Sequence, residues 1–151
     1  MTARNSHLLS ANFTAFAHAT EDIARVEQAL EFLITPMTRV EVALTRQYLK
    51  GHHGNMITTV SCRLSSKELS SEALSMLLQK LSELDRQFLS SSLGSCLDEE
   101  GNLYLRFDKQ EALLGNVRLC KGDPIRMKIK FAPDHDADAI IRVCRESGLI
   151  S

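Results

Sequence analysis

Three cations alternate with apolar residues near the carboxyl end of the chain, within residues 125–131. Arg126, Lys128 and Lys130 take every second position, and the positions between them are apolar. In an extended strand such residues point to one face, with neighbouring side chains roughly 6.6 Å apart. That spacing is close to the distance between phosphates of an extended nucleic-acid strand, so the segment suits a polyanion. The alternative is an ordinary half-solvated sheet, on which lysines also protect an exposed edge.

A second alternating segment, residues 103–107, places an aromatic ring beside a guanidinium group. Tyr104 and Arg106 share the face opposite three apolar residues. Such a pair on a sheet surface could stack a base and bind a phosphate. We predict that Lys109 also neutralises a phosphate, and that Gln110 hydrogen-bonds to sugar or base edges.

Residues 51–55, Gly-His-His-Gly-Asn, form a glycine-bracketed turn with two adjacent imidazoles. His52 and His53 would point to opposite sides of an extended segment. They therefore cannot chelate one metal as histidines at positions i and i+4 of a helix do. Because the glycines allow the backbone to approach a ligand closely, we predict that His52, His53 and Asn55 hydrogen-bond phosphate or sugar. A purely structural hairpin turn is a comparable interpretation.

Charge is unevenly distributed, although 18 Lys+Arg against 19 Asp+Glu give a net charge of −1. Residues 39–65 hold four basic side chains and one acidic one, a balance of +3. Residues 104–133 hold seven basic side chains and three acidic ones, a balance of +4. Local fields rather than net charge steer a polyanionic partner, so a net charge near zero does not exclude one.

Other kinds of site have less support in the sequence. No Cys-x-x-Cys pair occurs, which disfavours a zinc ribbon or a thioredoxin-type site and favours reduced, partly buried thiols at Cys62, Cys96, Cys120 and Cys144. A calcium loop starting at Asp134 would need glycine at Ala139 and glutamate at Arg145, and both positions fail.

Motifs for a nucleophile, a phosphate cradle or a dinucleotide are also absent from the sequence. We therefore expect no catalytic activity, no metal and no cofactor. A metal-dependent phosphoesterase using His52, His53 and Asp108 is the weaker alternative.

Apolar periodicity predicts the elements that position these residues. Strands are expected over residues 8–18, 38–47, 57–64, 103–107 and 125–131. Helices are expected over residues 21–34, 67–81, 82–93, a short stretch after Asp108, and 136–147. The first strand should direct Leu9 and Phe13 to the same face, and Thr20 should cap the first helix.

Three further details concern side chains within these elements. The second strand should place Val40, Val42 and Leu44 on one face, and the third helix should turn Leu84, Phe88 and Leu89 inward. Asp108 and Glu111 have the spacing of a capping box, in which each side chain accepts from the amide of the other residue. Gly115 suits the left-handed position after that helix.

This element order predicts an α+β fold with a mainly antiparallel sheet of about five strands and helices packed on one face. We expect one domain over residues 1–151, with a core at about 7–131. The hydrophobic content of 44% argues against disorder. Neither an apolar run long enough to cross a membrane nor a secretory signal is found, so a cytoplasmic protein without a membrane partner is expected.

Several separated motifs resemble one known family. They are residues 18–22, His-Ala-Thr-Glu-Asp; residues 51–55, Gly-His-His-Gly-Asn; residues 97–101; residues 103–110; Gly115; and residues 124–126, Pro-Ile-Arg. Over residues 7–131 the chain resembles the archaeal RNA-binding domain family of predicted exosome-associated proteins. It departs from the family pattern at Met56, where proline is usual, and at Cys96, where arginine is usual.

That resemblance implies a fold related to the 5S-rRNA-binding protein of the large ribosomal subunit. It also implies a cytoplasmic, non-catalytic RNA-binding role near RNA processing, with exosome or ribosomal components as partners. A protein-interaction subunit that docks through the acidic residues 66–103 or through a sheet edge is the alternative. The oligomeric state stays open, with a dimer as one option.

Overall fold

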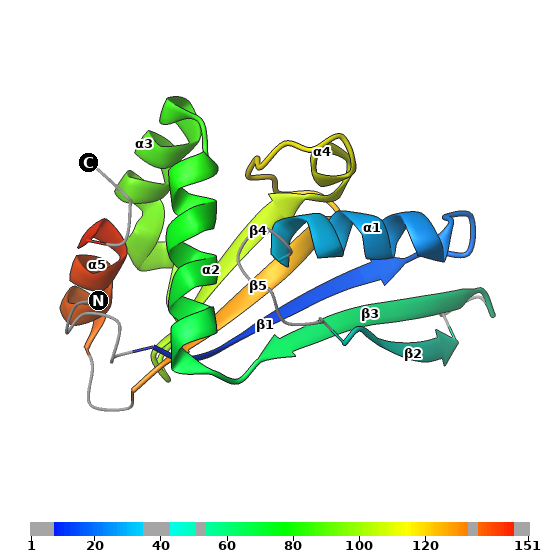
Figure 1. Cartoon of the computed structure of the whole chain (residues 1–151), viewed down its shortest axis with the longest axis horizontal. Coiled ribbons are helices and arrows are strands. Elements are labelled where there is room, and N and C mark those ends of the chain that lie inside the picture. Colours follow the sequence, from blue (N-terminus) through cyan, green and yellow to red (C-terminus); the bar gives the residue numbers. More distant parts are fainter. Residues whose placement is uncertain (1–7, 35–42, 51–53, 133–135, 147–151) are drawn as a thin grey trace.

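The computed structural model describes residues 8–34, 43–50, 54–132 and 136–146 (Figure 1). The elements follow the predicted order of strands and helices. They are β1 (Leu8–Ala17), α1 (Ile23–Ile34), β2 (Thr45–Lys50), β3 (Met56–Leu64), α2 (Lys67–Lys80), α3 (Glu83–Ser92), the 3₁₀ turn η3 (Leu93–Cys96), β4 (Asn102–Asp108), α4 (Lys109–Leu113), β5 (Pro124–Phe131) and α5 (Ala137–Glu146).

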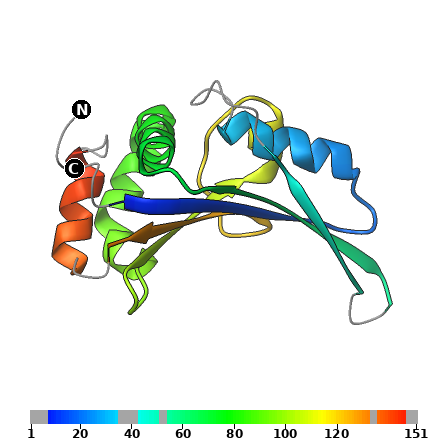
Figure 2. The ribbon, with the colours of Figure 1, turned by 60° about the horizontal axis from the view of Figure 1, so that its bottom comes forward.

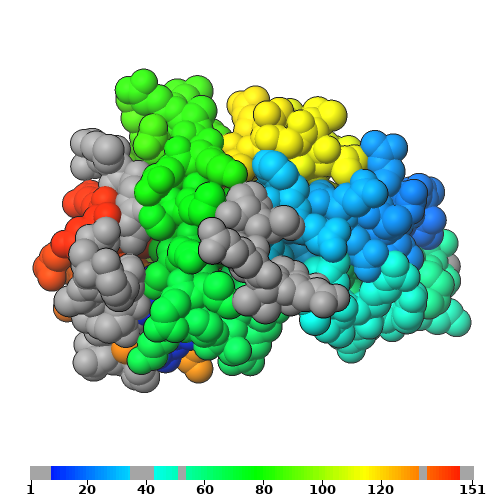
Figure 3. Space-filling model, viewed as in Figure 1, coloured from blue at the N-terminus to red at the C-terminus, as the bar shows by residue number. Residues whose placement is uncertain are grey.

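The five strands form one sheet in the order β2-β3-β1-β5-β4, and every neighbouring pair is antiparallel. Helices α1 and α2 lie across one face of this sheet, as Figure 2 shows from the side. In the space-filling view from the helical side, α1, α2 and α4 make up much of the surface (Figure 3). The predicted α+β fold with a five-stranded antiparallel sheet is confirmed.

Alternating apolar residues of the central strands form the core beneath the helices. Phe13 of β1, Phe107 of β4 and Ile129 of β5 are fully buried, and Leu30 of α1 and Leu74 of α2 belong to the same core cluster. The side chains between them therefore point to the other face of the sheet, since successive strand residues alternate. The two-residue period predicted for β4 and β5 is confirmed by this burial.

The start of β1 differs from its prediction. The register with β5 shifts between Leu8 and Ser10, and Leu8 is fully buried whereas Leu9 is only partly buried. An irregularity of this kind reverses the facing of the residues before it. The prediction that Leu9 and Phe13 share a face is therefore wrong, and Leu8 shares the core face with Phe13 instead.

The amino-terminal caps also differ in detail. Helix α1 begins at Ile23, and the carboxylate of Asp22, not Thr20, accepts the Ala24 amide at 3.0 Å. At α4, Asp108 accepts the Glu111 amide at 2.9 Å as predicted. The Asp108 amide, however, donates to the Arg118 carbonyl at 2.7 Å, so only half of the capping box forms. Pairing with a neighbouring segment has replaced the local bond.

Helix α3 shows the largest difference in burial. Leu89 is buried, but Leu84 and Phe88 are 72% and 52% exposed, so the prediction that all three point inward is wrong for two of them. Leu84 and Phe88 lie one turn apart on a different side of the helix from Leu89 and Leu93. Because α3 stands at one end of the sheet (Figure 1), only one of its sides is covered.

Strand β2 begins later than predicted, at Thr45 rather than residue 38. Leu44 precedes it and is partly buried, whereas Val40 and Val42 lie outside the described residues. Gly115, with φ of +89°, occupies the left-handed position after α4 as predicted.

All four cysteines are free thiols, and Cys62 and Cys144 are buried. Burial raises the pKa of the Cys144 thiol to about 12, so this thiol stays protonated at neutral pH. None of the helices in the described part of the chain is long and apolar enough to cross a bilayer.

Candidate nucleic-acid interface

The sheet face opposite α1 and α2 carries five cations. In each strand these cations alternate with buried residues, and the strand pairing sets them beside one another on the same face. The five cations are Arg63, Arg106, Arg126, Lys128 and Lys130. Within the described residues, no ion pair joins any of the five to a carboxylate. We call these five residues the basic face.

Acidic side chains are nearly absent from the described strands. Asp108 is the one acid among their residues, and its carboxylate is held by the Glu111 amide at the end of β4. Because no ion pair with a described residue neutralises them, the cations of the basic face produce a positive potential over the sheet. This potential depends on where the charged side chains lie and does not follow from the net charge of −1.

Two rows of side chains cross the sheet at this face. One row joins Arg106 and Arg126 to Thr14 and Ser61, and the row beside it joins Tyr104 and Lys128 to Asn12 and Arg63. Adjacent strands lie about 4.8 Å apart, so each row of four spans roughly 14 Å. All of these residues except Arg106 line a shallow groove of about 540 Å³. Cations, hydroxyls, an amide and an aromatic ring thus lie together on one surface.

Tyr104 is held in place at the β4 edge of this surface. Its hydroxyl donates to Asp98 Oδ2 at 3.0 Å, and the Lys128 ammonium lies 5.9 Å from the centre of its ring. Burial, with a contribution from the bond to Asp98, raises the pKa of the Tyr104 hydroxyl. The ring is partly exposed and fixed at one end, which suits stacking against a planar group.

Asp98 organises the turn before β4. Its carboxylate accepts the Asn102 side-chain amide, the Asn102 and Glu100 backbone amides and the Tyr104 hydroxyl, all at 2.9–3.0 Å. These donors, above all the Asn102 side chain, lower the pKa of Asp98 from 3.8 to about 2. The carboxylate therefore stays ionised and keeps Tyr104 oriented at neutral pH.

Replacing Asp98 by asparagine is expected to lower the urea midpoint of unfolding at pH 7, because an amide has one acceptor oxygen for four donors. A lowered pKa in the folded state gives stability that is present above pH 3.8 and lost as pH falls toward 2. The difference between wild type and Asp98→Asn should therefore shrink between pH 4 and pH 2. Glu100→Gln keeps the backbone amide that Asp98 accepts, so it is the control and should leave the midpoint at pH 7 unchanged. A gap of constant size at every pH would contradict this account.

Lys109 does not lie on the basic face. Its side chain is 4% exposed, and its ammonium donates to the Phe16 carbonyl at 2.7 Å, Glu21 at 2.9 Å and Asp123 at 2.6 Å. Three acceptors occupy all three donors of the ammonium group. The prediction that Lys109 neutralises a phosphate therefore lacks the exposed cation it needs, and Lys109 instead joins three segments of the fold.

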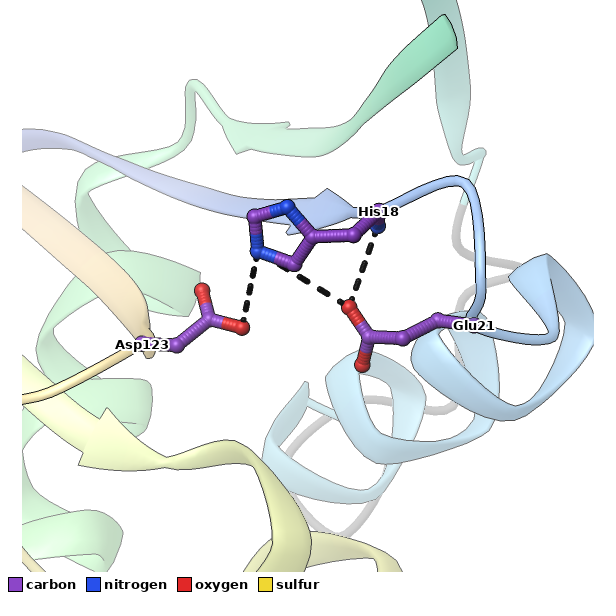
Figure 4. Close-up of side chains that lie close together, drawn as sticks. All are labelled: His18, Glu21 and Asp123. Carbon is purple, nitrogen blue, oxygen red and sulfur yellow. Dashed lines mark hydrogen bonds and ion pairs between the residues drawn. The ribbon is translucent and has the colours of Figure 1, made fainter. Parts of the chain in front are cut away.

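The acids around Lys109 also approach a histidine, as Figure 4 shows. His18 Nε2 lies 3.1 Å from Asp123 and 3.9 Å from Glu21, and one ligand atom from each of the three lies within 4.8 Å of the others. The Lys109 ammonium already contacts both carboxylates and supplies the positive charge between them. This arrangement is an ion-pair network, and the chemistry of its donors does not require a metal.

The structure separates the remaining predicted residues from the basic face. Gln110 is exposed on α4 and lines a pocket with Glu21, Asp22 and Arg25 on the helical side. Asn55 is exposed at the end of the β2–β3 hairpin, roughly 20 Å along the strand from the row of Ser61. His52 and His53 lie outside the described residues, so their predicted role is untested.

Sequence reasoning did not select Arg63 and Asn12 as site residues. Both alternate with buried residues in their strands, and Arg63 belongs to the first basic segment, so a signal was present. What makes them part of the surface is the pairing of β1 with β3 and β5, which puts Asn12 opposite both Arg63 and Lys128.

A sheet with helices on one face, cations on the other and a surface tyrosine among them is typical of proteins that bind nucleic acid through a sheet. The chain belongs to the RNA-binding family, whose model matches residues 10–131. It is 33% identical over 135 residues to the RNA-binding protein PAB1135 of Pyrococcus abyssi, and the match covers 87% of each chain. The predicted resemblance to an RNA-binding family is thereby confirmed.

Solved structures of two further proteins share the fold. Protein AF2318 from Archaeglobus fulgidus is 28% identical with a TM-score of 0.78, covering 93% of this chain and 99% of that one. The DUF54 protein Mth689 from Methanothermobacter thermautotrophicus is 27% identical with a TM-score of 0.73, covering 94% of this chain and 98% of that one.

Proposed function

We propose that this protein is a non-catalytic RNA-binding protein that holds an RNA strand on its basic face. The observation that carries the proposal is the set of five cations that share one sheet face with Tyr104 and form no ion pair with a described residue. The cations would neutralise phosphates and so supply affinity without sequence preference. The proposal replaces Lys109, Gln110 and Asn55 of the predicted set with Arg63 and Asn12.

The chemistry of the surface favours unpaired RNA over a duplex. Tyr104 presents a ring for stacking, and Asn12, Thr14 and Ser61 add hydrogen-bonding groups in the neighbouring rows. Aromatic side chains stack only on bases that are splayed from a helix, and single strands or loops provide them. We therefore propose single-stranded RNA or loops as the substrate class.

Replacing Tyr104 by alanine is expected to weaken binding to a single-stranded RNA dodecamer roughly tenfold, since base–aromatic stacking contributes about 1–3 kcal/mol. Tyr104→Phe keeps the ring and should remain within about twofold of wild type by the same argument. Fluorescence anisotropy of the labelled RNA measures both. Tyr48 is the second of the chain's two tyrosines and pairs with Thr58 on the helical side of the sheet, so Tyr48→Ala is the matched control.

Two results would contradict this proposal. If Tyr104→Ala binds RNA as tightly as wild type does, Tyr104 does not stack on a base. If Tyr48→Ala loses as much affinity as Tyr104→Ala does, the effect is not local to the basic face. Circular dichroism of each variant checks that the protein is folded.

Association with RNA-processing, exosome or ribosomal assemblies in the cytoplasm is the finer part of the proposal. The resemblance of the motifs supports it, and the exposed helix α3 offers a surface for a partner. Purification of the tagged protein from its own cells, with and without nuclease, tests it. Partners lost with nuclease are linked through RNA, whereas partners that remain contact the protein directly.

A further inference from the structure

A cavity of about 400 Å³ lies between α3 and the edge strand β4. Its walls are mostly apolar, from Phe88, Leu97, Leu105 and Leu119, with Arg106 and Lys121 among its lining residues. Pockets of this size, with an apolar lining and few polar groups, are the usual form of small-ligand sites. A single planar base fits within it.

The cavity adjoins the basic face. Tyr104 and Arg106 belong to both, because Tyr104 also lines the groove across the sheet and Arg106 stands beside Arg126. An RNA strand that follows the rows of the basic face toward β4 therefore reaches the mouth of the cavity.

The edge of β4 presents polar backbone groups to this cavity. Asn102 and Arg106 direct their carbonyls outward, to the Asp98 amide at 3.0 Å and the Cys120 amide at 3.1 Å. Between these two bonds, the Tyr104 carbonyl and the Arg106 amide point the same way and form no backbone hydrogen bond with a described residue. One acceptor beside one donor matches the paired donor and acceptor on the hydrogen-bonding edge of a base.

Phe88 supplies a surface for stacking. Phe88 is 52% exposed, although other residues of α3 pack against the core. The Lys121 ammonium lies 6.0 Å from the centre of the Phe88 ring. The nearest acid of α3 is Asp85, whose carboxylate already accepts the Leu119 amide at 3.0 Å. Asp108 and Asp123 also lie near Cys120 in the cavity wall, but Asp108 accepts the Glu111 amide and Asp123 is paired with Lys109. A phosphate near Lys121 and Arg106 would therefore meet two cations and acids that are already bonded.

We propose that this cavity binds one unpaired base, turned out of the RNA strand on the basic face and stacked on Phe88. Lys121 and Arg106 hold the phosphates on either side of that nucleotide. The inference rests on the proposed function, because the strand must first lie on the basic face. It adds a second stacking position, on a helix, to the one that Tyr104 offers on the sheet.

The chain contains no tryptophan, so Phe88→Trp places a single fluorescent reporter in the cavity. We expect a single-stranded RNA dodecamer to quench this tryptophan, because a stacked base quenches indole fluorescence. Inorganic polyphosphate, which carries the charge but no base, should bind without quenching. Leu84→Trp, on the same helix and outside the cavity lining, is the matched control and should not respond to either polymer.

Anisotropy of a labelled RNA, measured in parallel, separates this inference from the proposed function. Binding with no quenching of Phe88→Trp, or equal quenching by polyphosphate or in Leu84→Trp, would overturn the base pocket and leave the basic face intact. Absence of RNA binding by the wild type would overturn both. As a second measurement, Phe88→Ala should weaken RNA binding roughly tenfold with an unchanged salt dependence.

Discussion

Replacing Arg126, Lys128 and Lys130 together by alanine is expected to weaken binding to single-stranded RNA roughly a hundredfold at 0.1 M salt. Each cation that neutralises a phosphate releases about 0.7 counterion from a single strand, so three contacts contribute about two decades of affinity at that salt concentration. The slope of log affinity against log salt should fall by about two for the same reason. Anisotropy titrations over a salt series measure both quantities.

Net charge alone must not explain such a loss. Arg25, Lys67 and Lys80 are exposed on α1 and α2, over the opposite face of the sheet, so their triple alanine variant changes the net charge equally. This control should keep an affinity within about threefold of wild type, because exposed charges beyond a Debye length of about 10 Å are largely screened. If both variants lose RNA affinity equally, the basic face is not the binding surface. If neither variant loses affinity, phosphate neutralisation does not account for RNA binding.

Replacing Lys109 by methionine is expected to destabilise the fold by about 3 kcal/mol, because breaking a buried ion pair leaves its partners uncompensated. The change leaves the Phe16 carbonyl without its donor, and it leaves the carboxylates of Glu21 and Asp123 close together without a cation between them. These partners are 23% and 42% exposed, so water screens part of the effect and the loss lies at the lower end of the range for buried pairs. Urea unfolding measures it.

Lys130→Met is the matched control for this substitution. Lys130 is exposed on β5, so its unfolding free energy should change by no more than about 0.5 kcal/mol. Folded Lys109→Met should bind RNA as wild type does, since its ammonium does not reach the basic face. A loss of stability below 1 kcal/mol would contradict the structural role of Lys109. An RNA affinity that falls while stability is unchanged would indicate that Lys109 contacts RNA.

Side chains that share a strand could be grouped from the sequence, because strand alternation is a local property of the backbone. Leu103, Leu105 and Phe107 predicted the inward face of β4, and this placed Tyr104 and Arg106 on the other face. The same reasoning grouped the three cations of β5. Their grouping needed no knowledge of any other element.

Helix faces were harder to assign, since a helix buries whichever side a neighbour covers. Leu84 and Phe88 follow the helical period and are nevertheless exposed, because α3 stands at one end of the sheet. Their apolar character predicted core positions, whereas packing left them at the surface. Phe88 became a candidate ligand-binding residue only through its position beside β4.

The sequence by itself determined that residues 103–107 and 125–131 form amphipathic strands and that the chain folds as an α+β protein. The tertiary structure alone decided which cations lie together. Register between distant strands aligned Arg63 with Lys128 through Asn12. Packing of α1 against α4 brought Glu21, 88 residues away, onto Lys109. Lys128 and Lys109 are the same residue type in the sequence. Whether a lysine contacts solvent or a carboxylate depends on contacts between segments far apart in the chain.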